Sequence, residues 1–289
     1  MKGLFILFGL LSSLNLYSKS SVTLAAGDWP PFLKKKGLAH LGVGAHIVKK
    51  ALKSQGIQVK FKFYPWSRGM TEAKKAKKVD GAILWLKNPD REKIFYYSDK
   101  VMAETNVFFH LKGSSFKCSS DNNLLAYKCM EEIAKKNLRV GGIYKFSYSN
   151  HFDKAVGKSG DKDDSSKAII KNFKRKRNSI INFEMLIKGK IDLYPQEINV
   201  GYYELNNLIK NKSDATKVTH LNIPLQEKPS YLIMSKKNKI NEKIIKKFNE
   251  GLKALRESGE YEKMLALDKS GGYACKEFKK ENSGTIPGC

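Results

Sequence analysis

Residues 57–86 read IQVKFKFYPWSRGMTEAKKAKKVDGAILWL and contain a complete strand–helix–strand pattern. In residues 57–64, apolar side chains alternate with polar ones, mostly lysine, which is typical of a half-buried strand. Residues 66–78 have the spacing of an amphipathic helix, and residues 80–86 form a short buried strand. Because a helix connects the two strands, the pattern predicts a βαβ unit in a mainly parallel sheet.

The same alternation extends to both sides of this stretch. Upstream, residues 22–26 predict a strand and residues 41–52 a helix. After an extended apolar stretch at residues 101–111 the alternation restarts, and a second extended stretch at residues 230–235 follows it. The elements of the second series and the closing helices are 123–136 (helix), 138–143 (strand), 183–188 (helix), 191–194 (strand), 200–210 (helix), 241–258 (helix) and 261–267 (helix).

This order predicts an α/β fold of two lobes, with the second lobe inserted into the first and two strands crossing between them. Each lobe is then a mainly parallel sheet flanked by helices. We expect lobe 1 at residues 21–108 and 231–270, lobe 2 at residues 109–230, and a loop-rich C-terminal tail at residues 271–289.

The chain of 289 residues is strongly basic, with 54 Lys and Arg against 28 Asp and Glu and a formal net charge of +26. Such a charge attracts polyanions without specificity. The basic run KNFKRKR at residues 171–177 is short, and the other lysines are spread along helix faces, as at residues 74–78. We therefore interpret the charge as a solvated basic surface and expect no specific nucleic-acid partner.

Residues 1–20, MKGLFILFGLLSSLNLYSKS, place a lysine before a short apolar run and end in small and polar residues. This is the pattern of a secretory signal peptide, with cleavage expected after Ser20. The apolar run is shorter than the roughly 20 residues that a transmembrane helix needs, and no later stretch reaches that length. A buried N-terminal helix or a retained anchor is the alternative. We expect an exported protein.

Export favours disulfide bonds for the four cysteines, which lie in two local pairs. More than one pairing is possible, but Cys118 with Cys129 and Cys275 with Cys289 close the shortest loops. Zinc is the alternative, although neither the cysteine spacings nor the five scattered histidines match a zinc site. The histidines also form no nucleophile–base pattern. We expect no metal, no cofactor and no catalytic residue.

All three tryptophans follow predicted strands. Trp29 lies in the segment GDWPPF after the first strand, Trp66 in YPWSR after the next, and Trp85 at the end of the third. The carboxyl ends of parallel strands share one edge of a sheet, where ligands bind in open α/β folds. The tryptophans therefore predict an aromatic cleft at that edge, with Asp28 and Phe32 beside Trp29. Alternatively, Trp29 and Phe32 only cover the core.

The segments GDWPPF, PWSRG, KKVDGAILW and NPDREKIFYYSD, in this order and spacing, resemble lobe 1 of extracellular solute-binding proteins of family 3. The second half resembles lobe 2 of that family through LRVGGIYKFSYS at residues 138–149 and NFEMLIKGKIDLYPQE at residues 182–197. The resemblance covers about residues 22–265. It implies the type II periplasmic-binding-protein fold with two hinge strands, and the function of a receptor for a polar amino acid ABC importer.

The resemblance also implies roles for individual residues. Trp29 matches the aromatic residue that stacks on the ligand, and Arg91 matches the arginine that holds its carboxylate. A guanidinium fits a carboxylate through two parallel hydrogen bonds. Ser147 matches a hydroxyl at a helix start, and Glu197 matches the acid that receives the ligand's ammonium group. The alternative for Arg91 is a surface arginine paired with Asp90 or Glu92, and the alternative for Glu197 is a helix cap.

Two positions depart from the family's pattern, because Asn88 replaces a threonine and Lys145 replaces a glycine. These changes alter the surroundings of a carboxylate. Arg68 is a candidate for a second contact with an anion, or it lies on a helix surface. Aromatic residues near the same positions would favour an aromatic, sugar-like or longer ligand, and they are Trp66, Trp85, Tyr144 and Tyr148.

By this resemblance, a ligand binds lobe 1 and the lobes then close, so that Tyr144, Ser147 and Glu197 cover it. The small-molecule ligand must bind the closed form more tightly for closure to follow. The resemblance implies a periplasmic monomer, whose closed form is then expected to dock on a membrane ABC permease. An enzyme is the alternative, since some relatives are cyclohexadienyl dehydratases, in which case Glu197 would act as acid and base.

Overall fold

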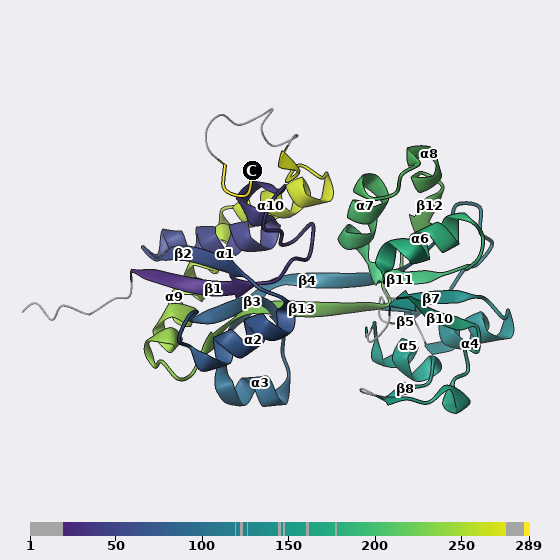
Figure 1. Cartoon of the computed structure of the whole chain (residues 1–289), viewed down its shortest axis with the longest axis horizontal. Helices are drawn as coiled ribbons and strands as arrows, with labels where there is room; N and C mark the ends of the chain where they lie inside the picture. The colour runs from purple at the N-terminus through teal and green to yellow at the C-terminus, as the bar shows by residue number, and fades with distance from the viewer. Residues whose placement is uncertain are drawn as a thin grey trace, which may run out of the picture.

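The computed structural model describes residues 20–118, 120–121, 124–125, 127–143, 146, 148–159, 162–176, 178–275 and 286–289. Two lobes are joined by two long strands, β4 (Phe95–Leu111) and β13 (Gln226–Ser235) (Figure 1). Of the predicted signal peptide, only Ser20 is among the described residues. Within these residues, none of the helices combines the length and the apolar character that crossing a bilayer requires.

Lobe 1 is built on the predicted parallel unit. Strand β1 (Ser21–Ala26) lies between β2 (Gln58–Phe63) and β3 (Gly81–Leu86) and is parallel to both. The helices of this lobe are η1 (Ala39–Leu41), α1 (Val43–Ser54), α2 (Trp66–Lys75), α3 (Pro89–Ile94), α9 (Ile240–Glu257) and α10 (Glu260–Lys269).

Lobe 2 is the inserted part. Its helices are α4 (Tyr127–Lys135), α5 (Asn150–Ala155), η2 (Ser165–Lys167), α6 (Ser179–Ile187), α7 (Ile198–Asn207) and α8 (Lys212–Ala215). Its strands are β5 (Ser120–Asp121), β6 (Leu124–Leu125), β7 (Val140–Ile143), β8 (Lys158–Ser159), β9 (Lys162–Asp163), β10 (Phe173–Lys176), β11 (Tyr194–Glu197) and β12 (Val218–His220). Much of the basic run at residues 171–177 is therefore strand β10, which pairs in parallel with β7.

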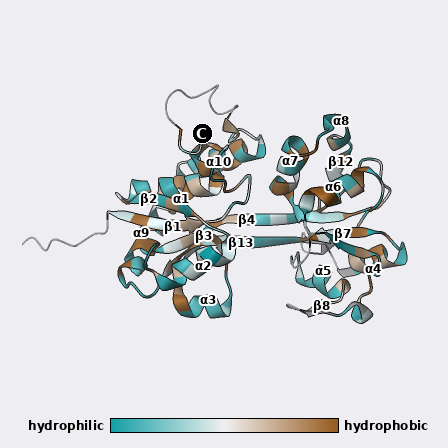
Figure 2. Ribbon diagram, in the orientation of Figure 1, coloured by the Kyte–Doolittle hydropathy of each residue, from teal (hydrophilic) through white to brown (hydrophobic). Residues whose placement is uncertain are grey.

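One mixed sheet runs through both lobes in the order β11–β4–β13–β3–β1–β2, and β12 also pairs with β4. Strand β13 is antiparallel to both of its neighbours, so the sheet is less parallel than predicted. Both crossing strands also begin earlier than predicted, at Phe95 and Gln226. Figure 2 shows that they are hydrophilic where they pass between the lobes. In β13 the missed residues 226–229, QEKP, are polar or proline, which explains why an apolar criterion did not include them.

Separate hydrophobic clusters hold the two lobes. In lobe 1, alternate residues of β1 face opposite sides, so Leu24 packs with α1, α9 and α10 while Ala25 packs with α2. Further clusters around Phe152 and Phe183 form the interior of lobe 2. Val200 of α7 belongs to the large lobe 1 cluster, so α7 makes an apolar contact between the lobes.

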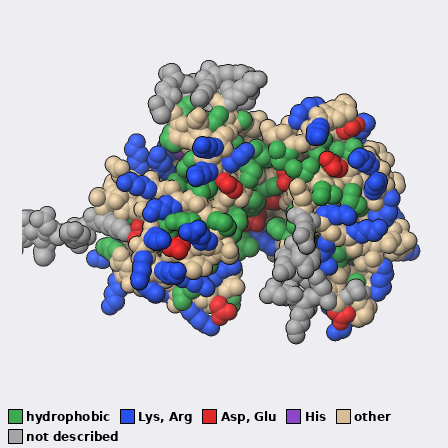
Figure 3. All heavy atoms as spheres, in the orientation of Figure 1, with side chains coloured by type: hydrophobic (Ala, Val, Ile, Leu, Met, Phe, Trp, Pro, Cys, Tyr) green, Lys and Arg blue, Asp and Glu red, His purple; other side chains and the backbone are tan. Residues whose placement is uncertain are grey.

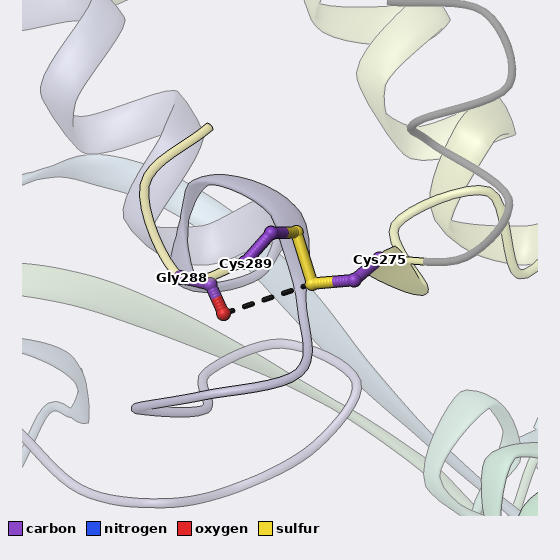
Figure 4. The surroundings of a disulfide bond; sticks show 3 residues. All are labelled: Cys275, Gly288 and Cys289. Atoms are coloured by element: carbon purple, nitrogen blue, oxygen red, sulfur yellow. Dashed lines mark hydrogen bonds between the residues drawn. A yellow bond between two sulfur atoms is a disulfide. The ribbon is translucent and has the colours of Figure 1, made fainter. Parts of the chain in front are cut away.

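The cysteines pair within each local segment, as expected. Cys118 bonds to Cys129 in lobe 2, and Cys275 bonds to Cys289 in the tail. Figure 4 shows the second pair, with Gly288 O 3.6 Å from Cys275 Sγ. A disulfide sulfur carries no proton, so this is a packing contact. The bond holds the last four residues beside the chain that follows α10.

Candidate functional site

The parallel strands of lobe 1 bring the three tryptophans to one edge of the sheet. Trp29 follows β1, Trp66 begins α2 after β2, and Trp85 lies near the end of β3. The ring centroids of Trp29 and Trp66 are 6.4 Å apart and those of Trp66 and Trp85 5.4 Å, both pairs edge to face. All three rings are half-buried. They form a continuous surface, which together with Arg91 we call the aromatic row.

Trp66 is positioned by the absence of a side chain at Gly27. A Cβ atom at that residue would lie 2.4 Å from Trp66 Cε2, so the indole packs directly on the backbone. Phe32 supports the other end of the row from the core side. Its ring centroid lies 4.6 Å from that of Trp29, and the side chain is fully buried. In this structure Phe32 therefore packs against the core, and its contact with a ligand stays a prediction.

Arg91 places its guanidinium at the Trp85 end of the row. Its Cζ lies 4.8 Å from the Trp85 ring centroid, and its Nη1 donates to Leu86 O at 3.0 Å. Asn88 caps α3 by accepting a hydrogen bond from Arg91 N at 3.1 Å. Asp90 pairs with Lys93 at 2.9 Å instead of with Arg91, and among the described residues no carboxylate forms an ion pair with Arg91. The guanidinium therefore keeps donors for a ligand.

A second cation lies beside Arg91, and the sequence alone did not indicate it. Lys87 Nζ lies 5.1 Å from the centroid of the Tyr231 ring and 5.7 Å from that of Tyr97. The Tyr97 hydroxyl donates to Leu86 O at 3.2 Å, the same carbonyl that accepts from Arg91. The position of Lys87 directly after β3 could have marked it. The two tyrosines come from the crossing strands, and only the strand pairing brings them here.

Glu197 has the geometry of the helix-cap alternative. It is 2% exposed, and Oε2 accepts a hydrogen bond from Val200 N at 2.8 Å at the start of α7. Oε1 lies 3.4 Å from Thr105 N on crossing strand β4. Burial raises the pKa of Glu197 to about 8, although these hydrogen bonds act to lower it. The residue thus lies where lobe 2 meets a crossing strand, with its carboxylate oxygens engaged by the protein.

The remaining predicted residues are dispersed. Tyr148 is 1% exposed in the lobe 2 core, where its hydroxyl accepts from Ile143 N at 2.8 Å. Asp28 is exposed and accepts from Lys35 N at 2.9 Å, which ties the loop after β1. Arg68 is exposed, with its Cζ 5.4 Å from the Tyr64 ring centroid. Tyr144 and Ser147 lie outside the described residues.

The two lobes enclose a hollow. Figure 3 shows it between them, with hydrophobic side chains on both sides and acidic ones at its base. The aromatic row supplies apolar indole faces and edges, nearly perpendicular from one ring to the next, and Arg91 and Lys87 supply positive charge at one end. Such a set suits a small molecule with a planar or apolar body and a carboxylate.

Solved structures share this architecture at low sequence identity. The second substrate-binding domain of a putative amino acid ABC transporter from Streptococcus pneumoniae aligns with a TM-score of 0.60 and 18% identity, over 88% of this chain and 100% of that one. The unliganded, open L-cystine solute receptor of Neisseria gonorrhoeae gives 0.60 and 17%, over 85% and 91%. An ancestral amino acid-binding protein, a precursor of cyclohexadienyl dehydratase, gives 0.56 and 19%, over 84% and 94%. At these identities the likeness establishes the fold alone.

The sequence comparisons supply the family. No curated protein matches the chain. The family model of the bacterial extracellular solute-binding proteins, family 3, matches residues 22–266, which include both lobes and both crossing strands. With its two lobes, its crossing strands and this match over most of its length, the chain belongs to the bacterial extracellular solute-binding proteins of family 3.

Proposed function

We propose that this protein is a periplasmic substrate-binding protein that captures an amino acid or a related carboxylate between its lobes and delivers it to an ABC permease. The observation that carries the proposal is Arg91, whose guanidinium stands at the end of the tryptophan row without a carboxylate partner among the described residues. A ligand carboxylate would fill that position through charge-assisted hydrogen bonds.

The body of the ligand would lie along the indoles. Trp29, Trp66 and Trp85 are held by packing on Phe32, on the Gly27 backbone and on one another, so their surface is already in place before a ligand arrives. A preformed surface lowers the entropy cost of binding. An aromatic or long aliphatic side chain on the ligand fits this row better than a small one.

Closure would use β4 and β13 as the hinge. These strands connect the proposed lobe 1 (residues 21–108 and 231–270) with the proposed lobe 2 (residues 109–230), and β13 shows register shifts on both sides of Tyr231. Lobe motion about a few residues at strand irregularities is a common form of domain closure. The ligand stabilises the closed form only by contacts that the open form lacks.

Export and the partner complete the proposal. The N-terminal signal sequence would direct the chain to the periplasm, where it acts as a monomer and its closed form docks on the permease. The similar structures include a substrate-binding domain of a putative amino acid ABC transporter and an L-cystine receptor, which supports an amino acid or a related compound as the ligand class.

Isothermal titration of the purified protein with amino acids and small carboxylates tests the proposal. Arg91→Ala should weaken binding of the ligand found by about 10- to 100-fold, since hydrogen bonds to charged groups contribute about 1.5–3 kcal/mol each. Trp29→Ala should weaken it as well. Lys93→Ala is the matched control, because it removes one exposed cation from the same helix. Equal affinity in Arg91→Ala and wild type would contradict the site, and no binding of any carboxylate would contradict the function.

A further inference from the structure

Two adjoining cavities lie between α7 of lobe 2 and α10 of lobe 1, with volumes of about 500 and 610 Å³. We call them together the α7–α10 cavity. Four residues line both parts, two from each lobe, and they are Asn199, Tyr202, Asp268 and Lys269. Among the described residues that line it, none belongs to the aromatic row. The cavity is large enough for a small organic molecule, since ligand sites typically have about 300–1,000 Å³.

Asp268 is an unusual wall residue. It is 5% exposed, and its Oδ1 has no hydrogen-bond partner among the described residues. Buried carboxylates are normally paired, because losing water without a partner costs several kcal/mol. Burial raises the pKa of Asp268 to about 7, and the charge of Lys269 works in the opposite direction. The neighbouring titratable group is Tyr273, whose pKa Asp268 raises together with burial.

Apart from Lys269 and Lys100, which lines the second part, the rest of the wall is apolar or neutral. Pro31 and Leu38 line one part and Phe32, Met102 and Leu265 the other. The Asn199 amide of α7 lines the cavity, as does Tyr203, whose hydroxyl accepts a hydrogen bond from Lys34 Nζ at 2.8 Å. Among the described residues, no group of three or more His, Cys, Asp or Glu side chains could hold a metal ion. The acceptor thus suits one organic cation better than a metal.

We propose that the α7–α10 cavity is a second binding site, which takes a small primary ammonium compound with an apolar body. The ammonium group donates to Asp268, and the apolar body packs against Pro31, Leu38 and the tyrosine rings of α7. Because α7 and α10 belong to different lobes, such a ligand contacts both lobes at once. It would therefore favour the lobe arrangement seen here, and it would be coupled to a ligand at the aromatic row wherever closure changes that arrangement.

Isothermal titration with 2-phenylethylamine at pH 8 tests this site, with 2-phenylethanol as the neutral probe of the same shape. Wild type should bind the amine saturably and the alcohol at least about 10-fold more weakly, in line with the loss of a charge-assisted hydrogen bond. Between pH 8 and pH 6, amine affinity should fall about 10-fold, because the ionised fraction of a group with pKa about 7 falls from about nine-tenths to about one-tenth.

Variants locate the binding. Asp268→Asn should lower amine affinity at least about 10-fold, because it removes the same charge-assisted hydrogen bond. Glu262→Gln, an exposed acid on the same helix, and Arg91→Ala should leave it unchanged. The proposal is overturned if wild type does not bind the amine, if it binds amine and alcohol equally, if Asp268→Asn binds as wild type does, or if Arg91→Ala loses the amine. The comparison of amine with alcohol needs no variant, so a folding defect in Asp268→Asn leaves the test intact.

Discussion

The loop after β1 contributes to two sites that carry opposite charges. Trp29 belongs to the aromatic row, which ends in a guanidinium without a carboxylate partner among the described residues. Two and three residues later, Pro31 and Phe32 line the α7–α10 cavity, whose wall includes Asp268, a residue with one carboxylate oxygen that has no partner among the same residues. The arginine is half-buried and the aspartate almost fully buried. The two sites should therefore differ in ligand charge and in their response to pH.

The largest expected effect concerns the stability cost of Asp268. Its folded pKa of about 7 lies above its ordinary value of 3.8. The folded state thus holds a proton that the unfolded chain releases, and wild type loses stability as pH rises between about 4 and 7. Asp268→Asn should remove this loss and raise the free energy of unfolding at pH 8, relative to pH 4, by up to about 4 kcal/mol.

Urea denaturation of wild type, Asp268→Asn and Glu262→Gln at pH 4, 6 and 8 measures this difference. Each variant is compared with itself across pH, so a constant packing effect of the asparagine cancels. Glu262 is exposed on α10 and should follow the wild-type curve. Parallel curves for wild type and Asp268→Asn would mean that the carboxyl finds a partner or water in solution.

The contrast between the sites also marks what the sequence could predict. The aromatic row could be predicted, because strand ends and tryptophans are both recognised from short stretches of sequence. Parallel pairing then brings the ends of these strands to one edge of the sheet. The α7–α10 cavity could not be predicted, since α7 and α10 are far apart in the sequence. In addition, the helix predicted at residues 261–267 ends before Asp268. Tyr148 shows a second limit, because the pattern gives its position in the chain but not the inward direction of its side chain. Glu197 shows a third, as one residue type serves both a ligand ammonium and a helix start.

Removing the tail disulfide should affect the α7–α10 cavity more than the aromatic row. The tail holds the loop after β1 through Ala39 N, which donates to Tyr273 O at 2.8 Å, and Gly37 N, which donates to Gly288 O at 2.8 Å. Replacing Cys275 and Cys289 by serine opens a loop with a sequence separation of 14. We expect a loss of about 3 kcal/mol in the free energy of unfolding. Amine affinity should fall more than solute affinity, since Tyr273 lines the cavity.

The other disulfide provides the matched control for this experiment. Cys118 and Cys129 have a sequence separation of 11 and lie in lobe 2. Their double serine variant should lose stability by a similar amount but leave amine affinity unchanged in the folded protein. If both double variants alter amine binding equally, the tail does not shape the cavity.

A smaller effect, on the row alone, is expected from Gly27→Val. The new Cβ would lie 2.4 Å from Trp66 Cε2, so the indole must leave its place between Trp29 and Trp85. Solute affinity should fall about 100-fold, or about 2.7 kcal/mol, while amine affinity is retained. Gly69→Ala in α2 is the control, because its nearest contact would be an ordinary 3.6 Å. Retained solute affinity in Gly27→Val would mean that Trp66 does not contact the ligand.

The smallest effect tests the shape of the charge at Arg91. In Arg91→Lys the positive charge remains, but the planar fork that donates to Leu86 O while leaving further donors for a carboxylate is lost. Affinity for a carboxylate solute should fall about 10-fold, or about 1.4 kcal/mol, less than for Arg91→Ala. Amide analogues of the solute should bind both proteins weakly. Full affinity in Arg91→Lys would show that the aromatic row needs only a positive charge at position 91, and Lys87 could also supply such a charge. The aromatic row and the Asp268 site would then differ only in the sign of their charge.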